Sequence, residues 1–525
     1  MTAAPMSKAS QPSPTTRPED ERLSLFSTVA YGFQHVLTMY GGIIAPPLII
    51  GTAAGVSPGD IGLLIAACLF MGGLATLLQT LGVPFFGSQL PLVQGVSFAG
   101  VATMLAIVSG GGGLPAVFGA VIVASLIGLV IAPFFSKIVR FFPPVVTGVV
   151  ITTIGLTLIP VAANWVMGGN SSAEDYGSPQ NLGLAALTLL TVIVLSKVGS
   201  ATISRLSILL AIVIGTVAAM IFGMTDFSAV SDGPTFAFPT PFHFGAPEFQ
   251  IAAIISMTIV ILVTLTETMA DIIAVGEITG SKVDQRRIAD GLRADMLSSA
   301  VSPVFNSFTQ SAFAQNVGLV AVTGVKSRFV VAAGGGILVV LGVLPVLGRV
   351  VTAVPMAVLG GAGIVLFGTV AASGIRTLAK VDYRGNMNLI IVATSIGFGV
   401  LPVVKPEIYD KFPAWFEIIF HSGISSAAIM AILLNLVFNV WTKGNPENAS
   451  VFVASGSRVV RPEVLASLAE GDRVQDGCLV DCDGKQVPVA EVPGADDPAE
   501  VEDAVAVERE AEARREQGSG SRDPR

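Results

Sequence analysis

The sequence has few charged residues and few residues of the kinds that bind metals. Only 13% of its 525 residues are charged, against about 25% in an average soluble domain. It has three cysteines and three histidines. Cys478 and Cys482 form C-x-x-x-C without further Cys or His ligands nearby, so no metal site is expected. No motif indicates a cofactor or nucleic-acid binding. These shortages argue against an ordinary soluble domain.

What the sequence has in excess is apolar residues, at 52% of the chain. Apolar segments of about 17–25 residues, the length that crosses a bilayer, recur from Leu25 to Trp441. They are too many for one soluble core, so the chain is predicted to be an all-α membrane protein. Residues 1–24 are polar and rich in Pro and Ser, without the short apolar run of a cleavable signal peptide.

We predict fourteen membrane-spanning segments. They cover about 25–50, 60–82, 91–108, 114–135, 143–166, 181–196, 204–223, 249–275, 286–302, 311–325, 328–347, 354–373, 386–403 and 420–441. If the N-terminus is cytoplasmic, the outer loops hold only Arg349, Lys405 and Lys411, and the other basic residues between Lys8 and Arg384 face inward. Cytoplasmic loops are enriched in Lys and Arg. We therefore expect a protein of the inner (plasma) membrane with both termini in the cytoplasm.

The fourteen segments divide into two sets of seven, at about 25–223 and 249–442. An odd number in each set would give the two halves opposite orientations, as in transporters with inverted repeats. One motif recurs at matching places: P-x-x-x-x-G opens the fifth segment at Pro143 and Gly148, and the twelfth at Pro355 and Gly360. Residues 1–24 form a cytoplasmic N-terminal segment, and residues 443–525 an acidic cytoplasmic tail that is partly disordered.

The third and tenth segments, Gly87–Met104 and Ser302–Gly324, are too polar and too interrupted for ordinary lipid-exposed helices. Broken segments at matching positions of two halves indicate a binding site near the middle of the membrane. Irregular backbone is tolerated at that depth only where protein buries it or water reaches it. We therefore predict broken helices here, with two helix N-termini whose partial positive charge suits an anionic or electron-rich ligand.

Two carboxylates, Glu267 and Asp271, lie four residues apart within the apolar eighth segment, on one face of the predicted helix. An ionisable group at the centre of a bilayer costs about 2.5–3.5 kcal/mol on insertion scales. It usually faces a polar cavity and serves a function. A pair of acids could also serve an intramembrane enzyme, but the sequence has no H-E-x-x-H motif to support hydrolysis.

The tenth segment contains the pattern Q-N-x-G-x-x-x-x-T-G, from Gln315 to Gly324. It resembles the signature of the nucleobase–ascorbate transporter family, also called nucleobase:cation symporter-2, which includes bacterial uric acid and xanthine permeases. Other positions match functional positions of that family: Gln34, His35, Ser97, Phe98, Glu267 and Asp271. The resemblance covers about Leu25 to Trp441 and excludes the tail.

The resemblance implies a core bundle (segments 1–4 and 8–11) and a gate bundle (segments 5–7 and 12–14), often packed as a homodimer. Its substrates would be purines. An ionised Glu267 would accept two ring N–H bonds, and Gln315 would meet an N–H and a C=O side by side. The backbone at Ala314 and Phe98 would add polar contacts, the Phe98 ring would close over the flat ligand, and Asn316 would organise the site. The simpler interpretation of these polar residues is hydrogen bonding between helices.

Proton coupling is the expected energy source. Asp271 lies one turn beyond Glu267, and a carboxyl group in a low-dielectric site can take up a proton near neutral pH. His35 would join this relay, although a lone His in an apolar helix often only packs. Asp295, in the ninth segment, resembles a family acid that precedes the signature, and organising the tenth segment is its expected role.

The resemblance also bears on the choice of substrate. Uracil carriers of this kind have an acid where this chain has Gln315, which favours purines. Ser97 is small and would leave room for the extra carbonyl of uric acid, whereas Val317 departs from the Asn common in xanthine carriers. We expect uric acid, with xanthine second. A uracil or other nucleobase permease and an anion carrier on the same architecture are the alternatives.

Overall fold

The computed structural model describes residues 17–135, 143–225, 227–231, 235–383 and 387–440, together with 473–475 and 478–480. The chain divides into two compact units, Met1–Glu447 and Asn448–Arg525. Within the second unit, strands β3 (Arg473–Gln475) and β4 (Cys478–Val480) pair antiparallel. The rest of the acidic tail, which we predict to be partly disordered, lies outside the described residues.

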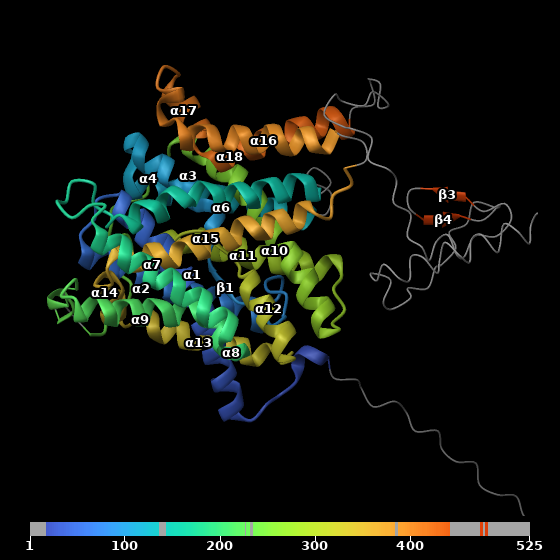
Figure 1. The fold of residues 1–525 in the computed structure, drawn as a ribbon. Coiled ribbons are helices and arrows are strands. Elements are labelled where there is room, and N and C mark those ends of the chain that lie inside the picture. The colour runs from blue at the N-terminus through green and yellow to red at the C-terminus, as the bar shows by residue number, and fades with distance from the viewer. Residues whose placement is uncertain are drawn as a thin grey trace, which may run out of the picture. The chain divides into compact units, whose positions relative to one another are not determined.

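The first unit is helical, as predicted (Figure 1). Its first half contains α1 (Leu25–Ala53), α2 (Pro58–Leu81), β1 (Gln94–Val96), α3 (Val101–Ile107), α4 (Gly113–Ile131), α6 (Pro144–Val166), α7 (Pro179–Val198), α8 (Ala201–Arg205) and α9 (Ser207–Ile221). Its second half contains α10 (Ile251–Thr279), α11 (Gln285–Val301), β2 (Gln310–Ala312), α12 (Ala314–Thr323), α13 (Arg328–Gly342), α14 (Pro345–Thr352), α15 (Met356–Leu378), α16 (Met387–Val404), α17 (Ala414–His421) and α18 (Gly423–Asn435). Short 3-10 helices include η1 (Pro18–Asp20) and η2 (Phe98–Gly100).

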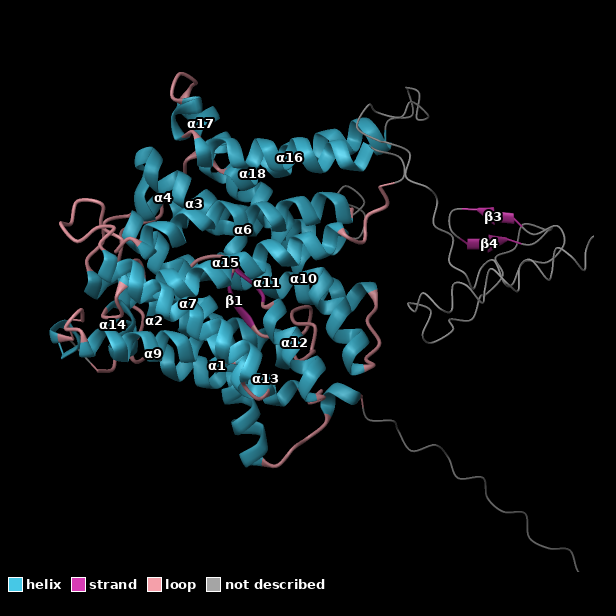
Figure 2. Ribbon diagram, in the orientation of Figure 1, coloured by secondary structure: helices cyan, strands magenta, loops and turns pink. Residues whose placement is uncertain are grey.

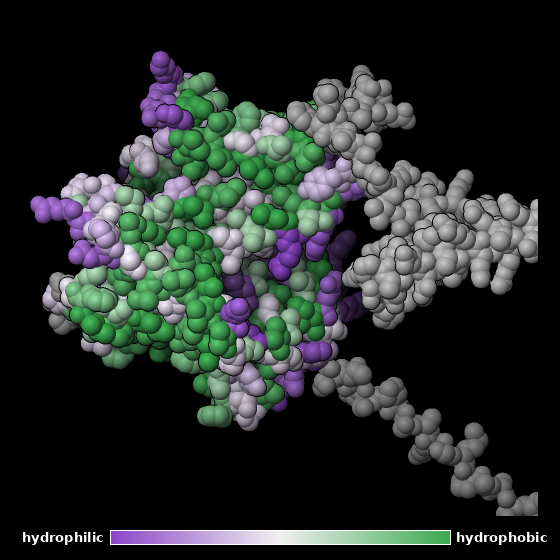
Figure 3. Space-filling view, in the orientation of Figure 1, coloured by the Kyte–Doolittle hydropathy of each residue, from purple (hydrophilic) through white to green (hydrophobic). Residues whose placement is uncertain are grey.

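Several helices are long and apolar enough to cross a membrane. The described residues contain eight such helices, or up to ten if each of two bent pairs counts as one crossing. The pair α13 and α14 bends by 78°. Hydrophobic residues cover much of the face shown in Figure 3, as expected for a surface in contact with lipid. A multi-pass membrane protein is thus confirmed, whereas fourteen crossings remain a prediction.

The third and tenth predicted segments are not continuous helices. Each begins with a strand and continues as a short helix: β1 leads through η2 into α3, and β2 leads into α12. The two strands, drawn in magenta in Figure 2, pair antiparallel with Gln94 opposite Ala312 and Val96 opposite Gln310. The sequence analysis predicted an interruption at both places but not the strands, because three residues are too few to show an alternating pattern.

Side chains on neighbouring helices satisfy the backbone of these strands. On α2, the Thr76 hydroxyl accepts a bond from Gln94 N (2.9 Å) and lies 3.3 Å from Gln94 O. On α11, the Ser299 hydroxyl does the same for Gln310, accepting from its N (2.8 Å) and donating to its O (3.2 Å). A two-stranded sheet has only edge strands, so without these hydroxyls its outer groups would be buried and unpaired.

The helices of the first unit form two groups, defined by which helices pack together. The strand-bearing group contains α1, α2, α3, α4, α10, α11, α12 and α13, with β1 and β2. The flanking group contains α6, α7, α9, α15, α16 and α18. These groups match the helices that the family resemblance assigns to a core and a gate.

The packing of the second half repeats that of the first. If each element is matched to the one seven predicted segments later, α1 corresponds to α10, α2 to α11 and α4 to α13. By the same rule α7 corresponds to α16 and α9 to α18. Helix α2 packs against α13, and its counterpart α11 packs against α4. In the same way the contacts α1–α13 and α7–α9 of one half correspond to α10–α4 and α16–α18 of the other. The two strand-bearing segments also make corresponding hydrogen bonds to each other. Ser97 N donates to Thr309 O (2.9 Å), and Phe313 N donates to Val93 O (3.0 Å).

The recurring P-x-x-x-x-G motif lies where α6 and α15 pack against each other. A Cβ atom on Gly148, near the start of α6, would lie 2.7 Å from the side chain of Leu378 at the end of α15. A Cβ on Gly360, near the start of α15, would lie 2.4 Å from the backbone of Val166 at the end of α6. Both glycines are needed for the close approach of these helices. Each lies near the start of its own helix and contacts the end of the other helix.

Candidate functional site

The predicted site residues lie on three elements that meet in the strand-bearing group. Glu267 and Asp271 are on α10, Ser97 and Phe98 follow β1, and Ala314, Gln315 and Asn316 begin α12. Helix α10 contacts both strand-bearing segments, through η2 and α3 on one side and β2 and α12 on the other. The fold therefore brings together segments more than two hundred residues apart in the chain.

The two acids occupy an open face of α10. Glu267 and Asp271 are half-buried and Ala270 between them is exposed, whereas Thr268 and Ile272 are buried. This pattern has the spacing of one helical face, as the sequence analysis predicted. The acids are therefore directed away from the tightly packed side of α10.

Helix α12 has an open face as well. Ala314 and Gln315 are exposed, and so is Gly318 one turn further on, where an added Cβ would meet nothing within 4 Å. Asn316 and Val317 are buried on the other side. The first N–H groups of a helix have no partner within it, so the backbone at Ala314 and Gln315 presents donors and a partial positive charge at the exposed start of α12.

Ser97 and Phe98 join β1 to α3. The Ser97 side chain is buried, and its hydroxyl accepts a hydrogen bond from Ala99 N (3.2 Å), which fixes the turn into the short helix. Phe98 is half-buried, and its ring centroid lies 6.1 Å from that of Phe367 on α15, at an interplanar angle of 71°. Phe98 thus lies where the strand-bearing and flanking groups meet.

Asn316 binds the first helix. Its Nδ2 lies 3.0 Å from Nδ1 of His35 and donates to the carbonyl oxygen of the same residue at 3.0 Å. Both side chains are buried. The contact joins α12 to α1, and the organising role that the sequence analysis gave Asn316 stays a prediction. His35 makes no hydrogen bond to Asp271 among the described residues, so no direct link between them supports a shared proton relay.

Asp295, on α11, is buried and hydrogen-bonded to α10. Its Oδ2 accepts a bond from the Thr268 hydroxyl at 2.5 Å, and the Thr268 oxygen lies 3.4 Å from Ala312 N on β2. Thr268 directly follows Glu267 in the chain. Thr268 therefore lies between Asp295 and the strand that leads into α12, and the organising role expected of Asp295 stays a prediction.

The comparison with known proteins is decisive for the family. A family model described as "Permease family" (Xan_ur_permease) matches residues 26–408. The xanthine permease of Bacillus subtilis (strain 168) is 41% identical over 416 residues, which are 79% of this chain and 94% of that protein. The uric acid transporter UacT of Escherichia coli (strain K12) is 40% identical over 429 residues, 81% of this chain and 89% of that protein. The chain belongs to this permease family.

Solved structures support the fold of this permease. The transmembrane domain of the cyanobacterial bicarbonate transporter BicA matches with a TM-score of 0.52 and 14% identity, over 80% of this chain and 99% of that one. Murine Slc26a9, an anion transporter solved in the inward-facing state, matches with a TM-score of 0.54 and 12% identity, over 80% and 69% of the two chains. At such low identity these matches concern the fold alone.

The family membership confirms the resemblance found in the sequence, and it identifies the protein as a transporter and not an enzyme. The hydrogen bonds of the structure also identify residues of the permease that the sequence analysis missed. Thr76, Thr268 and Ser299 hold the strands or Asp295 in place. Each is a hydroxyl residue in an apolar helix, a signal too common to be informative. Only Thr268 had a more specific signal in the sequence, because it is the residue next to Glu267.

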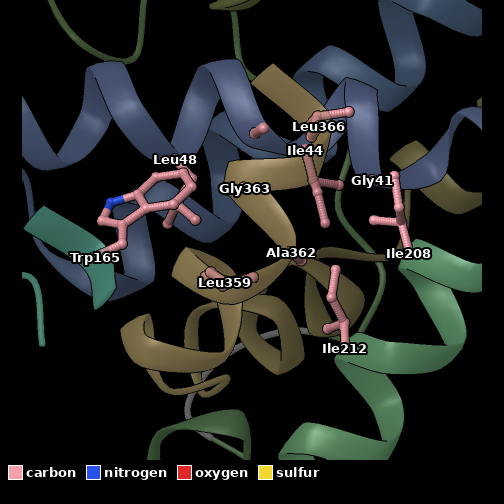
Figure 4. Close-up of a pocket in the computed structure, with 11 residues that line it drawn as sticks. Gly41, Ile44, Leu48, Trp165, Ile208, Ile212, Leu359, Ala362, Gly363 and Leu366 are labelled. Atoms are coloured by element: carbon pink, nitrogen blue, oxygen red, sulfur yellow. The ribbon is translucent and has the colours of Figure 1, made fainter. Parts of the chain in front are cut away.

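A small apolar cavity lies between α1 and the flanking group in this permease (Figure 4). Ile44 and Leu48 of α1 face Trp165 of α6 and Ile208 and Ile212 of α9 across it, and residues of α15 complete the lining. Among the described residues, no charged side chain lines this cavity. Elsewhere hydroxyl groups join the strand-bearing and flanking groups, because the Thr103 oxygen lies 2.7 Å from that of Ser422 at the start of α18, and the Ser256 oxygen on α10 lies 2.8 Å from that of Ser425 on α18.

Proposed function

We propose that this permease imports purine nucleobases, uric acid and xanthine, across the plasma membrane in symport with protons. The observation that carries the proposal is that α10, with the half-buried Glu267, packs against α12, whose first residues Ala314 and Gln315 are exposed. Relatives of about 40% identity are named as xanthine and uric acid carriers, which supports this substrate class.

The chemistry of the residues on α10, α12 and η2 suits a purine. The ionised carboxylate of Glu267 accepts ring N–H groups, and Gln315 pairs with a neighbouring N–H and C=O on the same edge. The helix N-terminus at Ala314 adds backbone donors for an electron-rich carbonyl. The Phe98 ring stacks on the flat ligand, and the small Ser97 leaves space beside it.

Transport would follow from movement of the strand-bearing group against the flanking group. Phe98 meets Phe367 at their boundary, and an apolar cavity separates α1 from α6, α9 and α15. The repeated packing pairs support seven segments in each half with opposite orientations. The distribution of basic residues supports both termini in the cytoplasm. The permease would pack as a homodimer, like other members of the family. Asp271 would carry the coupled proton.

An inorganic-anion carrier is the second candidate, because BicA and Slc26a9 share the fold. It is less well supported, since a small anion would be repelled by Glu267 on the same open face. The relatives of high identity are also named for purines and not for inorganic anions.

The test is uptake of radiolabelled uric acid and xanthine by cells that express the full chain, with and without a protonophore. We expect accumulation of the unaltered purine that the protonophore abolishes and that sodium does not stimulate. Uptake of labelled bicarbonate or sulfate without uptake of purine would favour the anion carrier. Purine uptake that needs sodium and survives the protonophore would replace the proton in the proposal.

A further inference from the structure

Four buried hydroxyl residues, which we call the hydroxyl latch (Thr103, Ser256, Ser422 and Ser425), join the strand-bearing group to the flanking group. The Thr103 oxygen on α3 lies 2.7 Å from that of Ser422 and 3.4 Å from that of Ser425. The Ser256 oxygen on α10 lies 2.8 Å from that of Ser425. All four residues are at most 1% exposed. Helix α17, which ends directly before Ser422, packs against α3 and α10 beside the latch (Figure 1).

The face of α10 that carries Ser256 is buried near the latch and exposed further along. Val260 and Val263, at the next two turns of this face, are 0% and 1% exposed. Glu267, one turn beyond Val263, is half-buried, and Ala270 is exposed. The contact between α10 and its neighbours on this face is therefore tight at the latch and loose around Glu267.

The two ends of this face lie toward opposite sides of the membrane in the proposed orientation. Ser256 is near the start of α10, and Glu267 is closer to its end at Thr279. Arg287 follows that end of α10, and Arg328 follows the end of α12. Because cytoplasmic loops are enriched in basic residues, the exposed end faces the cytoplasm and the latch lies toward the outside.

The latch is also where the symmetry between the two halves breaks down. Helix α3 packs against α18, and the counterparts of these helices are α12 and α9. Among the described residues, α12 and α9 make no comparable packing contact. The face of α12 with Gln315, Gly318 and Val322 is instead exposed. Two inverted repeats that exchange their conformations produce the opposite access state. In that state α12 would be covered and the contact between α3 and α18 would be broken.

We propose that the hydroxyl latch is an outer gate, which holds the permease closed on the side away from the cytoplasm and separates in each transport cycle. Hydroxyl groups suit this role because each one both donates and accepts. When the boundary opens, water replaces the lost partner, so neither state leaves a hydroxyl unpaired. The gate rests on the proposed movement of the two groups against each other, and not on the identity of the substrate or the coupled ion.

The first test is labelling of intact cells with a membrane-impermeant maleimide. The cells express the full chain with Cys478 and Cys482 replaced by Ser, and Val260→Cys is the probe, since this position is buried one turn beyond the latch. Adding Ser422→Ala and Ser425→Ala leaves the other two hydroxyls of the closed gate without partners, which favours its opening. We expect the probe to be labelled about 5-fold faster or more without the latch. An unchanged rate would overturn the proposal.

Ile261→Cys is the matched control for this labelling. Ile261 is also 0% exposed but lies on another side of α10, where its Cγ2 would be 2.6 Å from a Cβ on Gly128 of α4. Its rate should not change when the latch is removed. An equal rise at Val260→Cys and Ile261→Cys would show general loosening of the protein and would also overturn the proposal. The labelling needs neither purine nor proton, so it can fail while the proposed function stands.

A disulfide across the latch tests whether it must separate. When oxidised, Thr103→Cys and Ser422→Cys would join the strand-bearing group to the flanking group. The control pair is Ser196→Cys with Ser207→Cys, whose natural oxygens lie 3.0 Å apart within the flanking group. We expect oxidation to abolish uptake of uric acid and xanthine by the first variant but not by the control, and a reductant to restore it. Full uptake by a cross-linked latch would contradict the gate. If the disulfide does not form, the labelling comparison still decides.

Discussion

Thr268 connects more of the site than any other single side chain described above. Its hydroxyl donates to the Asp295 carboxylate at 2.5 Å and lies 3.4 Å from Ala312 N, while its neighbour Glu267 is on the open face of α10. It thereby ties α10, α11 and β2 at one point. A buried carboxylate without its hydrogen-bond donor is costly, so this contact constrains the position of Asp295.

Replacing Thr268 by Val should lower the free energy of unfolding by about 1–3 kcal/mol, because it leaves a buried carboxylate oxygen without its donor. Thr268→Ser is the control, since it keeps the hydroxyl and should remain near the natural stability. The measurement is thermal unfolding of both purified variants. Equal stability of the Val and Ser variants would show that the bond to Asp295 contributes little.

Glu267→Gln should reduce purine uptake by about 10- to 100-fold. The change replaces a charged acceptor by a neutral amide, and hydrogen bonds to charged groups contribute about 1.5–3 kcal/mol. Glu277→Gln, at an exposed position further along α10, is the matched control and should transport normally. Uptake would be measured at equal surface expression. Near-normal uptake by Glu267→Gln would remove this residue from the binding site.

The strand pair is the element that positions both short helices of the site. Thr76 on α2 and Ser299 on α11 satisfy the outer backbone of β1 and β2, at Gln94 and Gln310 respectively. The two interactions correspond to each other in the two halves of the chain, because α2 is the counterpart of α11 and β1 is the counterpart of β2. Each hydroxyl therefore fixes the start of one short helix.

Because Thr76 and Ser299 make equivalent contacts, Thr76→Val and Ser299→Ala should lower the stability of the protein by similar amounts. Each removes the partner of a buried backbone N–H and should lower stability by about 1–3 kcal/mol. Thr76→Ser and Ser299→Thr exchange the two natural hydroxyls and should be close to neutral. Chemical or thermal unfolding of the four variants is the measurement. A large loss from one removal and none from the other would show that only one strand depends on its neighbour.

Viewed as a whole, the permease carries its N-terminal segment as a clasp, Arg17–Arg22, on the strand-bearing group. Glu19 is 1% exposed and accepts bonds from Arg287 Nη2 and the Ser281 hydroxyl, both at 2.5 Å. Asp20 accepts from Arg328 Nε at 2.6 Å at the start of α13. Arg287 also donates to the backbone between α2 and β1. The clasp thus connects α11, α13 and the segment that follows α2.

The clasp should weaken in acid. Burial alone would raise the pKa of Glu19, but the hydrogen bonds from Ser281 and Arg287 outweigh it and hold the pKa below its ordinary value of 4.5. A lowered pKa stabilises the folded protein above the unfolded value and loses that effect as the pH falls through the folded one. The stability gap between the natural chain and Glu19→Gln should therefore be constant at neutral pH and shrink below about pH 4.5. A gap that does not change with pH on thermal unfolding would contradict the ionised clasp.

The sequence predicted the helical segments well because long apolar runs have few alternatives in a membrane. It placed Glu267 and Asp271 on one face, since helical spacing alone decides that. It did not predict β1 and β2, whose pairing joins residues more than two hundred positions apart and depends on Thr76 and Ser299. Nor did it predict the partner of Asn316, because the bond to His35 depends on how α1 packs against α12.

The central claim is that the acid of α10 and the amide of α12 bind one purine between them. A structure of the full chain determined with uric acid or xanthine bound tests it most directly. We predict the purine between α10 and α12, with the Glu267 carboxylate and the Gln315 carboxamide both at hydrogen-bond distance from its edges. A purine bound elsewhere, or one that contacts neither side chain, would contradict the account.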